Sequence, residues 1–189
     1  MLNIEGHAIV STDGMIADAE GAYPAALRND ADWRHYQAAL DTSVLTVIGR
    51  RGHERHKNPG RRRLVLTRAV AALTPDPKDA NATLWNPAGI GFHDALSALG
   101  IARGTVAITG VFDLFAPLYT GFALSERHDL LLPGGTPCFA SGHPRAALAD
   151  AGLHPARVDI IDTAPMVTTT HWRRPGLTAG LAADRPATR

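Results

Sequence analysis

The sequence VSTDGMIADAEGAYPAALRNDADW, residues 10–33, decides the fold. It begins inside an apolar segment, residues 3–11, which predicts a central strand because most of its positions are apolar. Asp13-Gly14 has the chemistry of a turn, since glycine permits a positive φ and aspartate bonds the backbone beyond it. Residues 17–28 are rich in alanine and glycine, a composition typical of a loop lying over a pocket. The stretch therefore predicts a strand, a turn and a covering loop ahead of a helix.

The end of this stretch predicts a helix of about three turns. Asn29 or Asp30 is a suitable N-cap, and acidic residues in the first turn interact favourably with the helix dipole. Apolar positions recur every three or four residues and predict one core-facing stripe of Trp33, Tyr36, Ala39 and Leu40. Asp30 lies in the first turn, opposite the covering loop, and is our candidate functional carboxylate. Capping of the helix alone is the competing interpretation.

The rest of the chain alternates between strand and helix patterns. Apolar and β-branched runs predict buried strands at residues 43–48, 64–66, 82–85 and 105–110. We expect a turn at 58–60, a polar loop at 74–82, helices at 90–99, 111–119 and 144–152, and a C-terminal hairpin of 157–164 and 166–174. This order predicts an α/β fold with a mostly parallel central sheet and an antiparallel C-terminal edge strand. We expect residues 1–174 to form a single domain and residues 175–189 a loose tail.

Composition excludes several classes of protein. The 189 residues carry a formal net charge of +1, so no overall field points to nucleic acid or to a membrane surface. The single cysteine, Cys138, rules out an intrachain disulfide and fits a reducing compartment. The start of the chain does not resemble a signal peptide, and we expect a cytoplasmic protein. His53 and His56 form an H-x-x-H pattern without a third ligand nearby, so we expect no metal site.

Polar and basic residues follow three of the predicted strands. Gly49 is followed by Arg50 and Arg51, and the strand at 64–66 is followed by Thr67 and Arg68. In open α/β sheets, ligands bind beyond the carboxyl ends of the strands, and arginine can hold a phosphate through paired hydrogen bonds. The third strand, at 105–110, ends in a glycine before a predicted helix, an arrangement often found where phosphate binds. Solvated turns are the competing interpretation of these residues.

Several segments, taken together in this order, resemble the dihydrofolate reductase family. DGMIADAEGAYPAALRNDADW (13–33) resembles the family's first strand exit, mobile loop and acidic helix start, and VIGRR (47–51) resembles its G-R motif. NPGRRRLVLTR (58–68) and ITGVFDLFAPL (108–118) are similar to its P-G-R turn and to its strand, glycine and helix element. The reductase domain of bifunctional riboflavin-synthesis enzymes, which shares this fold, is similar through S-x-D-G-x-I-A and G-G-x-P-x-F. The resemblance implies a divergent member with a dihydrofolate reductase-like three-layer fold.

The resemblance also implies roles for particular residues. Asp30 would bind a pterin-like ring and assist its protonation, and Arg61 would reach a substrate carboxylate. Tyr23, Trp33 and Ser125 would complete the substrate site. NADPH would be held by residues after the strands and along the first strand exit, namely Ala8, Met15, Ile16, Gly49, Arg50, Arg51, Thr67, Arg68, Thr109, Gly110, Val111 and Phe112.

Three functions follow from this resemblance. The first is an NADPH-dependent reductase of a pterin or folate-like heterocycle, acting by hydride transfer to a C=N bond. The second is a domain that has lost the cofactor and binds a ligand or a partner, favoured because Val111 replaces the second glycine of a pair and Ala25 replaces an expected tryptophan. The third is a riboflavin-pathway-type reductase of a ribosylated pyrimidine. The two reductase readings imply a small heterocyclic substrate, and a homodimer stays open.

Overall fold

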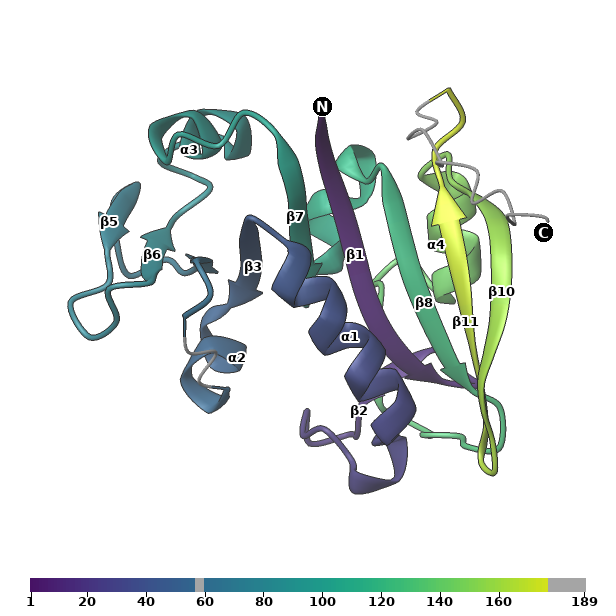
Figure 1. The fold of residues 1–189 in the computed structure, drawn as a ribbon. Helices are drawn as coiled ribbons and strands as arrows, with labels where there is room; N and C mark the ends of the chain where they lie inside the picture. The colour runs from purple at the N-terminus through teal and green to yellow at the C-terminus, as the bar shows by residue number, and fades with distance from the viewer. Residues whose placement is uncertain (57–59, 177–189) are drawn as a thin grey trace, which may run out of the picture.

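A nine-stranded sheet lies at the centre of the computed structural model, which describes residues 1–56 and 60–176. Its strands stand in the order β10-β11-β8-β1-β7-β3-β4-β6-β5 (Figure 1). They are β1 (Leu2–Ser11), β3 (Leu45–Gly49), β4 (Arg63–Leu66), β5 (Leu73–Pro75), β6 (Ala82–Trp85), β7 (Gly104–Thr109), β8 (Gly121–Arg127), β10 (His154–Thr163) and β11 (Met166–Arg173). A second, two-stranded sheet pairs β2 (Met15–Ala17) with β9 (Thr136–Pro137).

The six inner strands from β8 to β6 are all parallel to their neighbours, and antiparallel strands flank them at both edges. The predicted α/β class, the mostly parallel sheet and the antiparallel C-terminal edge are therefore confirmed. One prediction was wrong: the segment 74–82 is not all loop, because β5 pairs there with β6 and forms the other edge. Its Pro75 is tolerated because an edge strand needs fewer backbone donors.

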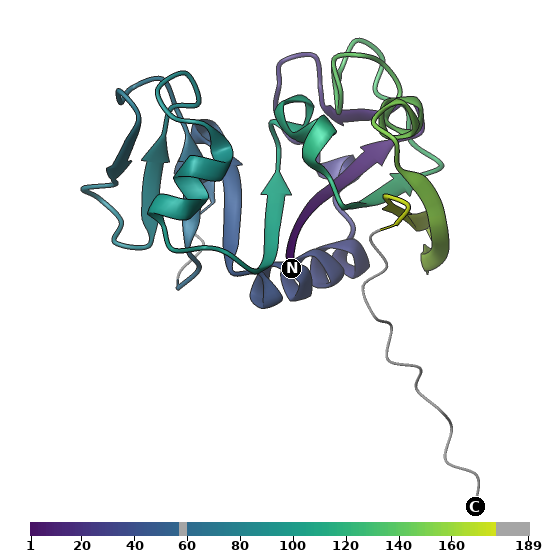
Figure 2. The same ribbon diagram turned by 90° about the horizontal axis from the view of Figure 1, so that it is seen from above.

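Helices cover both faces of the sheet. Helix α1 (Asp30–Thr42) lies on one face, while α3 (Phe92–Ala98) and α4 (Pro144–Asp150) lie on the other (Figures 1 and 2). The helix predicted at 111–119 is a 3₁₀ helix, η2 (Phe112–Leu118), and the arginines after β3 open a short helix, α2 (Arg50–Arg55). A further 3₁₀ turn, η1 (Ala25–Leu27), interrupts the covering loop.

Two sequence predictions fall on residues that the structure does not describe. The turn expected at 58–60 includes Asn58 and Pro59, and most of the expected tail, residues 177–189, also lies outside the described residues. Within the described part, no helix is both long and apolar enough to cross a membrane.

Aromatic side chains fill the core beneath η2. Phe112, Phe122 and Phe139 pack against one another with ring centroids 5.4–5.9 Å apart, and all three are buried. The Tyr119 hydroxyl donates a hydrogen bond to the Phe112 carbonyl at 3.1 Å. Gly6 lies directly under this cluster, since a Cβ there would stand 2.2 Å from the Phe122 ring. These contacts fix the chain immediately after the strand exit at Gly110.

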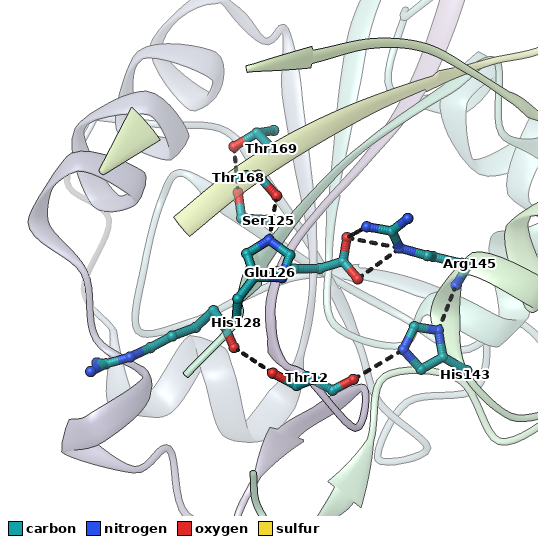
Figure 3. A network of polar contacts seen from close by, with 9 residues as sticks. Thr12, Ser125, Glu126, His128, His143, Arg145, Thr168 and Thr169 are labelled. Atoms are coloured by element: carbon teal, nitrogen blue, oxygen red, sulfur yellow. Dashed lines mark hydrogen bonds and ion pairs between the residues drawn. The ribbon is translucent and has the colours of Figure 1, made fainter. Parts of the chain in front are cut away.

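Successive residues of β8 serve opposite faces of the sheet, as the two-residue period of a strand requires. Glu126 is buried on the α4 side and accepts hydrogen bonds from the Arg145 guanidinium at 2.5–3.0 Å (Figure 3). His143 accepts from the Arg145 amide, and its other ring nitrogen lies 3.3 Å from the Thr12 carbonyl. This network fastens α4 to β8, while Ser125 faces α1.

Asn29 caps α1 and attaches its first turn to the C-terminal hairpin. Its Oδ1 accepts a hydrogen bond from the Asp32 amide at 2.9 Å, and its Nδ2 donates to Asp162 at 2.8 Å. Asn29 is 6 % exposed, so both bonds are largely shielded from water. Of the two caps that the sequence allowed, Asn29 is therefore the one used.

Replacing Asn29 should separate these two contributions. Asn29→Ala loses both bonds and should lower the free energy of unfolding by about 1–2 kcal/mol, as for other N-caps. Asn29→Ser keeps a capping hydroxyl but cannot reach Asp162, so its loss should be the smaller one. Urea unfolding of the two variants measures both values. Equal losses would show that the cap contributes nothing.

Candidate active site

A half-enclosed cavity of about 490 Å³ lies between α1, the covering loop and the sheet. Its lining is mostly apolar and aromatic, which is usual for sites that bind small molecules. The lining residues come from β1, β2, the covering loop, α1, η2 and β8, with one from the end of α2: His7, Ala8, Ile9, Ile16, Tyr23, Arg28, Asn29, Asp32, Trp33, His35, Tyr36, His56, Phe112, Ala123 and Ser125. Six of the residues that the sequence placed at the site lie here: Ala8, Ile16, Tyr23, Trp33, Phe112 and Ser125.

The structure does not bring Asp30 into this cavity. Its side chain is 79 % exposed and lies 3.8 Å from the Arg28 guanidinium. Asp32, two residues later, is partly buried and is the carboxylate among the lining residues. Because each helical residue turns by about 100°, a shift of two positions moves a side chain to a different face of the helix. The carboxylate that lines the cavity is therefore Asp32, and not Asp30, which the sequence suggested.

The surroundings of Asp32 favour its neutral form. Burial raises the pKa of the Asp32 carboxyl, although a hydrogen bond from Ser125 and the nearby His35 oppose this effect. Ser125 is itself buried and lies 2.8 Å from the hydroxyl of Thr169 on β11. This hydroxyl pair fixes the floor of the cavity beneath the carboxylate. An acid with a raised pKa can give up or receive a proton nearer neutral pH than an ordinary aspartate.

Aromatic rings form the opposite wall. Trp33 is 48 % exposed and packs against Tyr36, with ring centroids 5.6 Å apart. The Tyr36 ring also lies 6.2 Å from that of His7 on β1. The Tyr36 phenol forms a side-chain hydrogen bond with Thr109, which offsets part of the rise in its pKa caused by burial. Because Thr109 ends β7, this contact connects the cavity to the neighbouring strand exits.

Among the residues expected to hold NADPH, those that follow β3, β4 and β7 lie at neighbouring strand ends, because these three strands are adjacent and parallel. Arg50 is paired with Glu54 at 3.1 Å on the surface of α2, and Arg51 and Arg68 are exposed. Thr67 is buried, and its hydroxyl accepts a hydrogen bond from the Ala69 amide at 3.1 Å. The arginines at these strand ends therefore face solvent, while the Thr67 hydroxyl stabilises the turn that follows β4.

The turn after β7 keeps a glycine-like backbone without a second glycine. Gly110 has a φ of 77° and Val111 a φ of 52°, and Val111 is the one non-glycine residue with a positive φ in the described chain. A Cβ on Gly110 would meet nothing within 4 Å, so space is open beside it. A Cβ on Gly49 would stand 3.5 Å from the Val111 side chain. Val111 thus lies beside Gly49, beyond the carboxyl ends of the paired strands β3 and β7, and the next residue, Phe112, lines the cavity.

Arg61 and Met15 also lie outside the cavity lining. The Arg61 guanidinium bonds to the Asp41 carboxylate at 2.6 Å and to the Gln37 side chain at 2.8 Å, both on α1. It lines a separate polar hollow on the far side of Trp33. Met15 pairs with Pro137 in the small sheet. The expected contact of Arg61 with a substrate carboxylate has an internal competitor in Asp41.

His53, one half of the H-x-x-H pattern, bonds through Nε2 to Asp76 at 3.1 Å. No group of three histidine, cysteine or acidic side chains in the described part of the chain is placed to hold a metal ion.

Sequence reasoning did not assign nine of the lining residues to the site, among them Asp32, His7, His35 and Tyr36. A signal for Asp32 was present, because it precedes Tyr36 by four residues and side chains at that spacing share a helix face. The same rule applied equally to Asp30 and Trp33, which are three residues apart. His7 had no signal in the sequence, since a polar residue in an apolar strand does not show which face it occupies.

Comparison with known proteins shows the fold alone. No family model and no curated protein matches the chain. A solved structure from Shewanella sp. PV-4, provisionally assigned to riboflavin biosynthesis, has a TM-score of 0.65 at 18% identity and covers 91% of this chain and 98% of its own. A diaminohydroxyphosphoribosylaminopyrimidine deaminase/5-amino-6-(5-phosphoribosylamino)uracil reductase from Thermotoga maritima has a TM-score of 0.63 at 12% identity. The match covers 91% of this chain and 56% of that longer protein. The fold predicted from the sequence is thereby confirmed.

Substitution of the two acids in the first turn of α1, Asp30 and Asp32, should have opposite effects on stability. Because the pKa of Asp32 is raised in the folded state, its ionised form costs stability at neutral pH, and Asp32→Asn should increase the free energy of unfolding by about 0.5–2 kcal/mol. This gain should shrink as the pH falls to about 4, where an unfolded-state aspartate is about half protonated and the folded-state Asp32, with its raised pKa, is protonated to a greater extent. Asp30→Asn is the matched control and should lose about 0.3–1 kcal/mol of interaction with the helix dipole. Urea titrations at pH 4 and pH 8 measure both variants, and a loss of stability in Asp32→Asn at pH 8 would contradict the assignment.

Proposed function

We propose that this chain is an NADPH-dependent reductase of a small nitrogen heterocycle. The observation that supports this most is the position of one half-buried carboxylate, Asp32, in a mostly apolar cavity that adjoins the Gly110-Val111 turn. Such a cavity can hold two flat rings against each other, and the adjoining carboxyl ends of the parallel strands can hold the rest of a dinucleotide. The riboflavin-pathway names of both structural neighbours agree with a reductase of this kind.

The residues that follow β3, β4 and β7 suit a dinucleotide with an extra phosphate. Gly49 and Gly110 leave the backbone accessible, and the exposed guanidinium groups of Arg51 and Arg68 suit a phosphate on the ribose. Ala8, Ile16 and Phe112 line the cavity next to these strand ends and present the apolar surface that a nicotinamide ring would need. When bound, NADPH would supply the hydride, and the protein would supply position and a proton.

In this proposal Asp32 is the catalytic acid. It would hydrogen-bond the ring nitrogen or amino group of the substrate and hold a proton within reach of the reacting nitrogen. Ser125 fixes the carboxyl from below, and Trp33 and Tyr23 would keep the ring flat against the cavity wall. The covering loop would limit the entry of water, because Arg127 on β8 donates a hydrogen bond to the Ala26 carbonyl and holds the loop down.

The choice between a folate and a pyrimidine substrate rests on Arg61. A folate carries a carboxylate tail, and its recognition would need Arg61 to leave Asp41 and Gln37. Since exchanging one carboxylate partner for another gains little, the arrangement favours a substrate without that tail. We therefore propose an aminopyrimidine, of the type in the name of the Thermotoga maritima neighbour, as the substrate class.

Val111 supports a second candidate, a domain that has lost the cofactor. Its side chain lies beside Gly49, where a dinucleotide would pass between the strand exits. The same cavity would then bind a heterocycle without reducing it. Binding of NADPH separates the two candidates.

Titration of NADPH by its fluorescence is the test. The reductase proposal expects saturable binding that is weakened about tenfold by Arg68→Ala, since hydrogen bonds to charged groups contribute about 1.5–3 kcal/mol. Val111→Gly should tighten binding about threefold or more, because it removes the β-branched side chain beside Gly49 and lets the cofactor approach the backbone. Arg34→Ala, on the exposed side of α1, is the matched control. No binding to the wild-type protein, and binding restored by Val111→Gly, would support the second candidate instead.

Turnover gives the corresponding prediction for Asp32. With dihydrofolate and ribosylaminopyrimidines as alternative substrates, Asp32→Asn should reduce kcat by about 10²-fold or more while the Kd for NADPH stays within about twofold. Asp30→Asn should retain activity. Consumption of NADPH, followed by its absorbance, measures both variants, and an active Asp32→Asn enzyme would remove this carboxyl from the chemistry.

A further inference from the structure

We propose that His7 is a specificity-determining residue, which selects heterocycles carrying an uncharged polar substituent besides the group bound by Asp32. This inference rests on the proposed function for the identity of the ring, but its test does not need turnover. His7 lies on β1 with its ring facing α1, and it lines the cavity together with Ala8, Ile9 and Ala123.

His7 is a polar group in an apolar part of the wall. Within the described residues its ring nitrogens have no hydrogen-bond partner, and its one ring contact is with Tyr36 at 6.2 Å. The small side chain of Ala123, opposite it on β8, leaves the space beside the imidazole open. Polar groups in such surroundings lose their hydrogen bonds to water when a ligand enters, so a ligand must replace them. The imidazole therefore favours a ligand with a matching polar atom.

Burial keeps His7 neutral, and the charges around it act in the same direction. Desolvation by burial, followed by His35 from α1 and by Arg173 and His171 from β11, lowers the pKa of His7 to about 4. Three acidic groups stand nearby but are engaged elsewhere: Glu5 with Arg173 at 3.5 Å, Asp159 with Arg157 and His171 at 2.8–3.0 Å, and Asp32 with Ser125. A neutral imidazole has one donor and one acceptor, so it can match an oxo or an amino group but gains nothing from an anion.

His7 and Asp32 are spaced to contact the same ring. Asp32 lies over Ser125, which pairs with Ile9 on β1, and His7 precedes Ile9 by two residues on the same strand. Two strand residues span about 6.6 Å, and on α1 Tyr36 follows Asp32 by one turn, about 6 Å. Along both β1 and α1, the separation between Asp32 and His7 is therefore about 6 Å, close to the span of a substituted six-membered ring. A six-membered ring with one amino group at Asp32 can reach His7 with a second substituent.

The test uses two small neutral probes that differ by one oxo group, 2-aminopyrimidine and 2-amino-4-oxopyrimidine. Ligand-observed NMR measures their Kd values with wild-type protein and variants. His7→Leu should weaken the oxo probe about tenfold, the upper range for one neutral hydrogen bond, and change the other probe less than twofold. His7→Gln should retain most of the affinity, because the amide also has a donor and an acceptor. His93→Leu, on the exposed face of α3, is the matched control.

The outcomes are distinct from those for the proposed function. Equal losses for both probes in His7→Leu, or no binding of either probe to the wild-type protein, would overturn the role of His7. NADPH titration run in parallel tests the reductase proposal separately, and selective loss of the oxo probe without NADPH binding would leave His7 as a selector in a binding protein. The difference between the probes should also be constant from pH 8 to pH 6, because His7 stays neutral throughout that range.

Discussion

The hydrogen bond from the Asp32 amide to the Asn29 side chain determines the geometry of the candidate site. It fixes the residue at which α1 begins, and with it the rotation of every side chain on that helix. With Asn29 as the cap, Asp30 points into solvent, while Asp32 and Tyr36 point toward the sheet. The second bond of Asn29, to Asp162, places this helix end against the C-terminal hairpin. One buried amide thus decides which carboxylate enters the cavity.

The sheet supplies the other half of the site through its two-residue period. On β8, Ser125 faces the cavity and Glu126 faces α4, where the Arg145 guanidinium neutralises it. The polar residues on the two faces cannot exchange roles, because a shift by one residue would bury each beside the wrong partner. The Glu126-Arg145 pair therefore holds the register of β8, and the register holds Ser125 beneath Asp32. On β1, three consecutive residues, His7, Ala8 and Ile9, line the cavity.

The parallel strands could be predicted from the sequence, because buried strands such as 43–48 and 105–110 are continuous apolar runs. Strand β5 could not, because three residues of an edge strand, one of them proline, have no pattern to recognise. The site was harder, since Asp30 and Asp32 each precede an aromatic residue by one helical turn. The Asn29 cap and the position of Tyr36 in the cavity wall distinguish them, and both are visible only in the structure. The pairing of Arg61 with Asp41 joins residues 20 positions apart and has no local signal either.

The turn at Gly110-Val111 shows how a left-handed backbone can be held at a residue other than glycine. A left-handed conformation costs a non-glycine residue about 1–2 kcal/mol, and more for a β-branched one. The residues on both sides of Val111 leave it little alternative. Thr109 is paired with Ile48 on β3 and donates a hydrogen bond to the Val47 carbonyl, while Phe112 is locked among Phe122, Phe139 and the Tyr119 hydroxyl. Such strain persists where the surroundings over-determine it, and it concentrates at functional sites. The core beneath this strand exit, and not the residue at position 111, therefore sets the direction of the chain. This direction places the cavity next to the strand exits.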